Sequence, residues 1–167
     1  VLSNIISSQT EIHKKYGGVY PAMAKREHQN NLIPTLEKAL KTAKLLKISE
    51  RQISDSKTDI LKEILNRESN LYENLKKFLE KYEKPFDFAQ GKPAIDLIAV
   101  TEGPGLEPCL WAGVNFAKAL SYFWNIPVVP VNHIEAHILV NFLENNNIKF
   151  PAISLVVSGG HTQIILM

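Results

Sequence analysis

Short apolar runs in the C-terminal half of the chain constrain the fold more than any other feature. They are rich in Val, Ile and Leu and have the length of strands, and the stretches between them have helical spacing. Strands that alternate with helices are typical of an α/β fold with a mainly parallel sheet. The runs are Ile95–Val100, Val128–Val131 and Ile153–Val157, and we expect helices at about 110–125 and 133–145 and a closing hairpin strand over 162–167. The first run, continuous and apolar, predicts a strand buried on both faces.

The N-terminal half predicts mostly helix. Val1–Gln9 alternates weakly and indicates the end of a strand or hairpin. A helix is expected over Ala22–Asn31, with Pro34 kinking it or starting a new one. Ser56–Tyr82 carries apolar residues at three- and four-residue steps, which predicts a second amphipathic segment.

Charge is concentrated between Glu37 and Lys84, where 12 of the 19 Lys/Arg and 9 of the 17 Asp/Glu residues lie. The window therefore carries +3 and the rest of the chain −1, which together give the formal net charge of +2. Solvated helix faces explain such a window best, and a weakly basic surface that helps to bind RNA is the alternative.

Composition excludes several classes of protein. Cys109 is the single cysteine, so no internal disulfide can form, and no segment has the order of a signal peptide. No apolar run approaches the roughly 20 residues that cross a bilayer. We expect a cytoplasmic protein with no membrane partner. Because the chain begins at Val1 without an initiator methionine and ends on the apolar Ile164–Met167, we also expect a piece of a longer protein.

His133 and His137 form the first candidate site, directly after the run Val128–Val131. Two histidines four apart on a helix present their rings on one face, close enough to share a divalent metal. Surface or capping histidines are the alternative. Zinc peptidases place a general base beside the first histidine of H-E-x-x-H, but here that neighbour is Ile134, and Glu135 would point away from the metal. A metallopeptidase is therefore disfavoured.

Two glycine-rich loops also follow predicted strands. The turn Ser158-Gly159-Gly160 exposes backbone N–H groups that suit a phosphate or carbonyl oxygen, although the motif by itself favours a plain hairpin turn. The loop Thr101–Gly105 precedes a helix and is a possible anion site. Cys109 lies near no histidine in sequence and is expected to be a small packing residue rather than a nucleophile.

Five motifs in this order resemble one family, the tRNA N6-adenosine threonylcarbamoyltransferase catalytic subunit, also called TsaD, Gcp or glycoprotease. The resemblance covers residues 1–36 and about 94–167. The motifs are Gly17-Gly18-Val19-Tyr20-Pro21, Arg26-Glu27-His28, Thr101-Glu102-Gly103-Pro104-Gly105-Leu106, Val131-Asn132-His133-Ile134-Glu135-Ala136-His137 and Val156-Val157-Ser158-Gly159-Gly160-His161-Thr162-Gln163.

The resemblance implies an actin-like ATPase fold (ASKHA, ribonuclease H-like) and transfer of a threonylcarbamoyl group from threonylcarbamoyl-AMP to N6 of adenosine 37 in tRNAs that read codons beginning with A. It implies that His133 and His137 bind one divalent metal per subunit, iron or zinc. It implies tRNA and TsaB-like and TsaE-like subunits as partners. The residues that it assigns to the threonylcarbamoyl-AMP site are Val156, Val157, Ser158, Gly159 and Gly160.

The resemblance also divides the chain. Residues 1–150 would form a first actin-like lobe that lacks its first hairpin, and 151–167 would form the opening hairpin of a second lobe. Residues 37–93 would be a largely charged helical insertion and connector, and the fragment alone would be inactive. Glu107-Pro108-Cys109 departs from the small residues usual in the family after this loop. The alternatives are a non-catalytic scaffold of the same fold, which should lack the histidine pair, and a sugar-kinase or chaperone-type ATPase.

Overall fold

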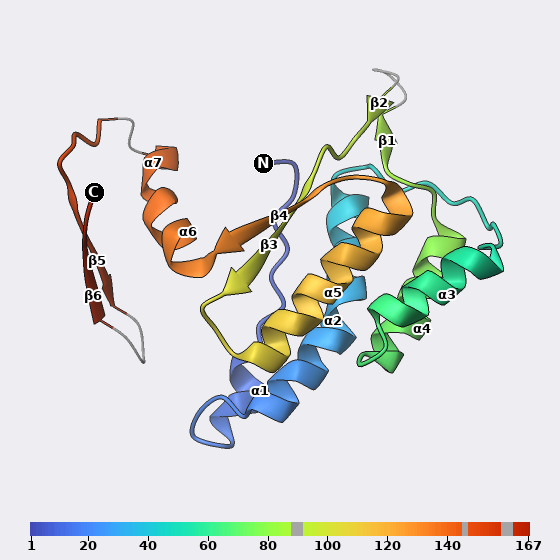
Figure 1. Ribbon diagram of the computed structural model, residues 1–167, viewed down its shortest axis with the longest axis horizontal. Helices are drawn as coiled ribbons and strands as arrows, with labels where there is room; N and C mark the ends of the chain where they lie inside the picture. Colours follow the sequence, from blue (N-terminus) through green and yellow to red (C-terminus); the bar gives the residue numbers. More distant parts are fainter. Residues whose placement is uncertain (88–91, 145–146, 158–161) are drawn as a thin grey trace.

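The computed structural model describes residues 1–87, 92–144, 147–157 and 162–167 (Figure 1). Helices and strands alternate in its second half, as the sequence predicts. The helices are α1 (Thr10–Lys14), α2 (Pro21–Thr42), α3 (Asp55–Ile64), α4 (Ser69–Lys81), α5 (Glu107–Trp124), α6 (His133–Leu139) and α7 (Asn141–Glu144). The strands are β1 (Phe86–Asp87), β2 (Lys92–Pro93), β3 (Ile98–Gly103), β4 (Val128–Asn132), β5 (Ile153–Val157) and β6 (Thr162–Leu166).

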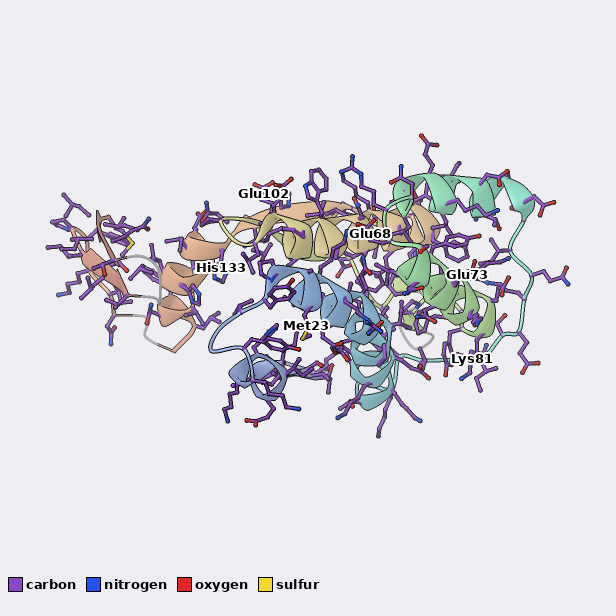
Figure 2. All side chains as sticks on the ribbon, turned by 90° about the horizontal axis from the view of Figure 1, so that it is seen from below. Met23, Glu68, Glu73, Lys81, Glu102 and His133 are labelled. Carbon is purple, nitrogen blue, oxygen red and sulfur yellow. The ribbon has the colours of Figure 1, made fainter. Side chains whose placement is uncertain are left out.

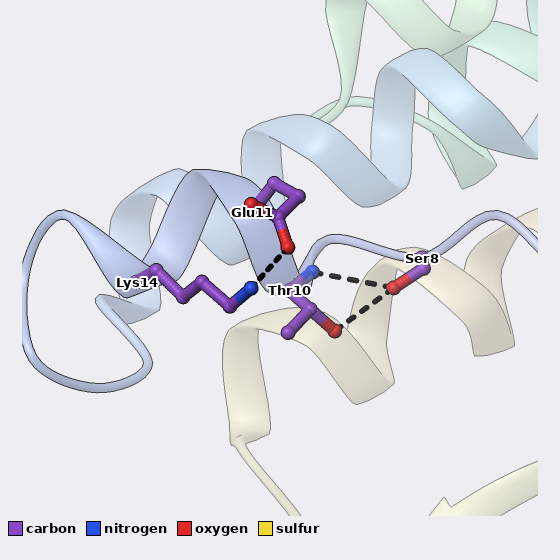
Figure 3. Close-up of polar contacts among 4 residues, drawn as sticks. All are labelled: Ser8, Thr10, Glu11 and Lys14. Carbon is purple, nitrogen blue, oxygen red and sulfur yellow. Dashed lines mark hydrogen bonds and ion pairs between the residues drawn. The ribbon is translucent and has the colours of Figure 1, made fainter.

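The N-terminal segment is not a strand, so the expectation for Val1–Gln9 was wrong. A strand needs a neighbour for its backbone groups, and no described strand pairs with this segment. The chain instead turns into α1, where the Ser8 hydroxyl accepts the N–H of Thr10 at 3.3 Å (Figure 3). An ion pair between Lys14 and Glu11 lies on the same short helix.

Helix α2 runs without a break through Pro34, so the expected restart there was wrong. Pro34 removes one intrahelical donor. Ile33 and Leu40, on either side of it, are buried in the common core, and this packing offsets the lost hydrogen bond. Pro21 stands in the first turn, where its missing N–H costs nothing.

The expected amphipathic segment 56–82 is two helices, α3 and α4, which join around Leu65–Glu68. Leu71, Leu75 and Leu79 are each 0% exposed and face α2 and the rest of the core. The charged window therefore supplies much of the hydrophobic core, which also takes in Phe116, Leu120 and Trp124 of α5.

Strands β3 and β4 pair in parallel, with Ile98 opposite Val128 and Thr101 opposite Val131. Helix α5 connects them and packs against both. The helix ends at Trp124 and is followed by Asn125, whose φ of 52° is the left-handed conformation common after a helix. Strand β3 begins at Ile98, three residues later than the sequence predicted. Burial on both faces was also wrong: Ala99 and Val129 are exposed, because among the described elements only α5 packs broadly on this pair.

Strands β5 and β6 form the predicted closing hairpin, with Ile153 opposite Leu166 and Val157 opposite Thr162. Within the described residues this hairpin joins neither strand of the parallel pair, so the expected single sheet is seen as separate two-stranded sheets. It lies with α6 and α7 at the end of the molecule away from α3 and α4 (Figure 1). Ile153 is 72% exposed, and Leu155, Val157, Ile164 and Leu166 are similarly uncovered. No described helix is long and apolar enough to cross a membrane.

The core position of α4 predicts a large effect of truncating Leu75. Leu75→Ala leaves a cavity among fully buried side chains and should lower the free energy of unfolding by about 2–5 kcal/mol, measured by urea denaturation of the full-length protein. Lys77→Ala, on the exposed face of the same helix, should change it by less than about 0.5 kcal/mol. Equal effects of the two substitutions would contradict the packing described here.

Candidate functional site

Candidate residues from the loop after β3, the helix after β4 and the strand β5 line one cavity. Its volume is about 430 Å³. The loop after β3, the first turn of α6 and the strand β5 all contribute to it. The lining residues are Pro104, Gly105, His133, Ile134, His137, Asn141, Ser154, Leu155, Val156 and Val157. The carboxyl ends of parallel strands meet at one edge of a sheet, and this explains why the first two segments come together.

The two histidine rings face each other across one turn of α6. The Nε2 atoms of His133 and His137 are 3.3 Å apart, and the rings are edge to face with centroids 4.5 Å apart. A hydrogen bond at this distance requires one Nε2 to carry a proton and the other to accept it. Both side chains are exposed to the cavity, and Figure 2 shows His133 at the start of α6.

Asn132 fixes the direction of this pair. It is the N-cap of α6, and its Oδ1 accepts the backbone N–H of Ile134 at 2.9 Å and of Glu135 at 3.1 Å. Asn141 closes the other end of the short helix, because its Nδ2 donates to the backbone oxygens of His137 and Ile138. The ring positions therefore depend on backbone geometry that is capped at both ends.

The histidine pair fits a shared divalent metal. Two nitrogen ligands at about 2.0–2.1 Å from one tetrahedral ion lie roughly 3.3–3.4 Å apart, close to the observed separation of the Nε2 atoms. Both nitrogens must then be free of protons. Among the described residues no group of three His, Cys, Asp or Glu side chains is arranged to hold a metal, so the pair supplies two ligands of a set. Glu135 does not line the cavity, in agreement with the direction expected for it.

The other predicted site residues divide into two groups. Val156 and Val157 line the cavity with the histidines. Ser158, Gly159 and Gly160 lie outside the described residues, and so does His161. In the loop after β3, Pro104 and Gly105 reach the cavity. The anion site expected there gains no support, because Glu107 puts a carboxylate into the first turn of α5, where an anion would otherwise be favoured.

A second cluster of hydrogen-bonded polar side chains, around Gln9, was not predicted from the sequence. Its Oε1 lies 3.3 Å from Nε2 of His13, and its Nε2 lies 3.4 Å from Nδ1 of His28. Since the backbone N–H of Tyr20 donates to Nδ1 of His13, His13 carries its proton on Nε2 and Gln9 donates to His28. Burial, and secondly the charge of His13, lower the pKa of His28. These side chains line a cavity of about 830 Å³. Gln9 and His13 are four residues apart, but the contact of Gln9 with His28 spans 19 positions, so no local motif reveals the cluster.

Cys109 and His28 line the same cavity. The residues next to Cys109 in the sequence did not indicate that a histidine lies near it. Burial raises the pKa of its thiol, against a smaller opposing effect of Lys25. A raised pKa disfavours the thiolate that a nucleophile needs. The expectation that Cys109 is a packing residue is consistent with this environment.

The cap of α6 generates a prediction. Asn132→Ala leaves two N–H groups of the first turn without their acceptor and should lower the free energy of unfolding by about 0.5–2 kcal/mol, measured by chemical denaturation of the full-length protein. Asn132→Asp keeps an acceptor oxygen and should restore most of the loss. If alanine and aspartate at this position were equally stable, the cap would not hold the helix.

Comparison with known proteins identifies one family. The model of one family, TsaD, the tRNA N6-adenosine threonylcarbamoyltransferases, matches residues 1–54 and 68–167. Of the charged window in which we expected an insertion, 37–93, the match leaves out 55–67. The matched residues include both histidines and the other residues that line their cavity.

Curated relatives carry the same name, tRNA N6-adenosine threonylcarbamoyltransferase. The protein of Fusobacterium nucleatum is 41% identical over 165 residues, which are 99% of this chain and 35% of the relative. That of Thermomicrobium roseum is 37% identical over 173 residues, 100% of this chain and 35% of the relative. The protein of Dictyoglomus turgidum is 41% identical over 167 residues, which are 100% of this chain and 36% of the relative. The chain thus spans about a third of the length of the relatives that it matches, and it belongs to the tRNA N6-adenosine threonylcarbamoyltransferase family.

Proposed function

We propose that the protein to which this chain belongs transfers a threonylcarbamoyl group from threonylcarbamoyl-AMP to N6 of adenosine 37 in tRNAs that read codons beginning with A. Family membership over nearly the whole chain supports the reaction class. The observation that carries the proposal in the structure is the single cavity that collects His133, His137 and Val157 from separate segments. We infer the fold of the complete protein to be actin-like, with residues 1–150 in the first lobe and 151–167 opening the second.

The proposed reaction requires that the enzyme position its two substrates, and it does not require a nucleophilic side chain. The adenosine amine attacks the carbamoyl carbon, the bond from that carbon to the phosphate oxygen breaks, AMP leaves, and the amine loses a proton. Because the mixed anhydride is already activated, no covalent enzyme intermediate is required. A half-buried Cys109 with a raised pKa suits such a reaction, since it offers no competing thiolate.

Within the cavity each segment has a proposed task. The Nε2 atoms of His133 and His137 hold one iron or zinc ion, which when bound polarises an oxygen of the substrate. Val156 and Val157 line the cavity, and we propose that they and the residues that follow, Ser158-Gly159-Gly160, bind the threonylcarbamoyl-AMP, with backbone N–H groups donating to its oxygens. Asn132 caps the helix that carries both histidines.

The partners follow from the same assignment. We propose tRNA as the acceptor substrate and TsaB-like and TsaE-like subunits as the protein partners. A scaffold of the same fold without catalysis is the second candidate. Such a scaffold does not require two histidines whose Nε2 atoms lie 3.3 Å apart beside a cavity, so the catalytic assignment is favoured.

The metal proposal is tested by elemental analysis of the purified full-length protein. His133→Ala and His137→Ala should each lower the bound iron or zinc from about one ion per subunit to a small fraction of that, because one remaining imidazole holds a metal weakly. Glu135→Ala, on the same helix but outside the cavity, should retain the metal. Unchanged metal content in both histidine variants would refute the assignment.

The activity proposal is tested in cells. Mass spectrometry of tRNA nucleosides should show loss of threonylcarbamoyladenosine when the full-length protein is depleted, and recovery when it is restored. The His133→Ala variant should fail to restore the nucleoside, whereas Glu135→Ala should succeed. A normal level of the modified nucleoside after depletion would rule out the proposed reaction.

A further inference from the structure

Lysines recur at every third position at the end of α2 and in the segment that follows this helix. The stretch 38–49 contains no Asp or Glu, so no acidic residue interrupts them. The first two lysines belong to α2, which ends at Thr42, and the other two come after it. All four side chains are exposed. This lysine row consists of Lys38, Lys41, Lys44 and Lys47.

The backbone that carries the lysine row is attached to the end of α4. The N–H of Glu83 donates to the backbone oxygen of Lys47 at 2.9 Å, and Ile48 pairs with Tyr82 in an antiparallel bridge. The hydroxyl of Tyr82 also donates to Oε1 of Glu37 on α2, at 2.6 Å. The row therefore lies on a backbone that is fixed by contacts on both sides of the end of α2.

The carboxylates nearest to the lysine row are already engaged. Glu83 pairs with Lys47 at 3.4 Å, and Glu37 pairs with Lys81 at 3.9 Å and accepts the hydroxyl of Tyr82. The other three ammonium groups of the row form no ion pair with a carboxylate in the part of the chain that the structure describes. Closely spaced like charges repel one another, and an anionic partner would relieve this repulsion.

Arg51 extends the positive surface toward α5. Its guanidinium lies 5.4 Å from the centre of the Phe123 ring, and the ammonium of Lys57 lies 5.3 Å from the same centre. Within the described residues neither cation is paired with a carboxylate. Contact with the ring holds these long side chains at the surface without neutralising them, so less conformational freedom is lost when an anion binds.

We propose that the lysine row and Arg51 bind the phosphate backbone of the tRNA, at a distance from the nucleotide that reacts. This rests on the proposed function, in which tRNA is the acceptor substrate. Exposed cations without carboxylate partners suit phosphates, which they bind whatever the base sequence. Figure 2 shows Lys81, whose backbone oxygen accepts the N–H of Ser49, far from His133 along the molecule. A nucleic acid is long enough to reach both places.

The test is the Kd of the full-length protein for an unmodified tRNA transcript, measured by fluorescence anisotropy over a series of KCl concentrations. Joint replacement Lys38→Gln, Lys41→Gln, Lys44→Gln should raise the Kd about tenfold or more at about 0.1 M salt. It should also reduce the slope of log Kd against log salt by about two to three, because about one phosphate contact is lost with each lysine.

Two matched variants separate local contacts from net charge. Lys15→Gln, Lys62→Gln, Lys118→Gln removes the same charge from exposed positions outside the lysine row and should leave the slope nearly unchanged. Arginine in place of the three substituted lysines of the row keeps the charge and should keep the Kd within about threefold of the wild-type value.

Equal effects of the two glutamine variants on the Kd and the slope would overturn the proposed surface and leave the proposed reaction standing. Vesicles that contain phosphatidylglycerol supply a second probe. If the lysine row were needed to bind these vesicles but not to bind tRNA, the surface would belong to a membrane contact and the proposal would fail. Absence of tRNA binding by the wild-type protein would contradict both the surface and the acceptor substrate. Metal content should be the same in all of these variants, because none of them alters a histidine.

Discussion

The burial of α5 is the constraint on which the rest of the structure depends. Its apolar residues are covered by β3 and β4 on one side and by α2 and α3 on the other. Ala112 and Ala119 have no exposed surface, and their small size lets the neighbouring elements come close. Because α5 connects β3 to β4, its position sets where both strands end. The loop after β3 and the histidines of α6 are therefore placed by packing that lies far from the chemistry.

This arrangement separates the stability of the chain from its proposed reaction. The core is built mainly from helical residues such as Leu75 and Trp124. The histidines lie on a short helix beyond the sheet, capped by Asn132 and Asn141. Few buried side chains support α6, and Ile138 is its only buried residue. The local geometry of α6 depends on these hydrogen-bonded caps, whereas the helical layer depends on apolar burial, so substitutions within α6 should leave the helical layer largely intact.

Much of this was predictable from local patterns. The apolar run at Val128–Val131, the histidine spacing and the hairpin after Ile153 are all local signals, and each is seen. The errors came where tertiary contacts decide. Packing of Ile33 and Leu40 carries α2 through Pro34, and Val1–Gln9 finds no strand to pair with among the described elements. The hydrogen bond from Asn115 to Glu68 and the one from Gln9 to His28 join positions far apart in sequence, so spacing alone gives no sign of them. The turn Ser158-Gly159-Gly160 stays a prediction.

The central claim is that the imidazoles of His133 and His137 together hold the metal of a transferase site. X-ray absorption spectroscopy of the metal in the full-length protein tests it most directly, because the fine structure reports the ligand atoms and their distances. The account predicts two imidazole nitrogens at about 2.0–2.1 Å from one zinc ion, or slightly farther from iron, with both lost in the doubly substituted His133→Ala, His137→Ala protein. Two results would contradict this claim. One is a spectrum of the bound metal that contains no imidazole nitrogen, and the other is a spectrum that is the same in the doubly substituted protein.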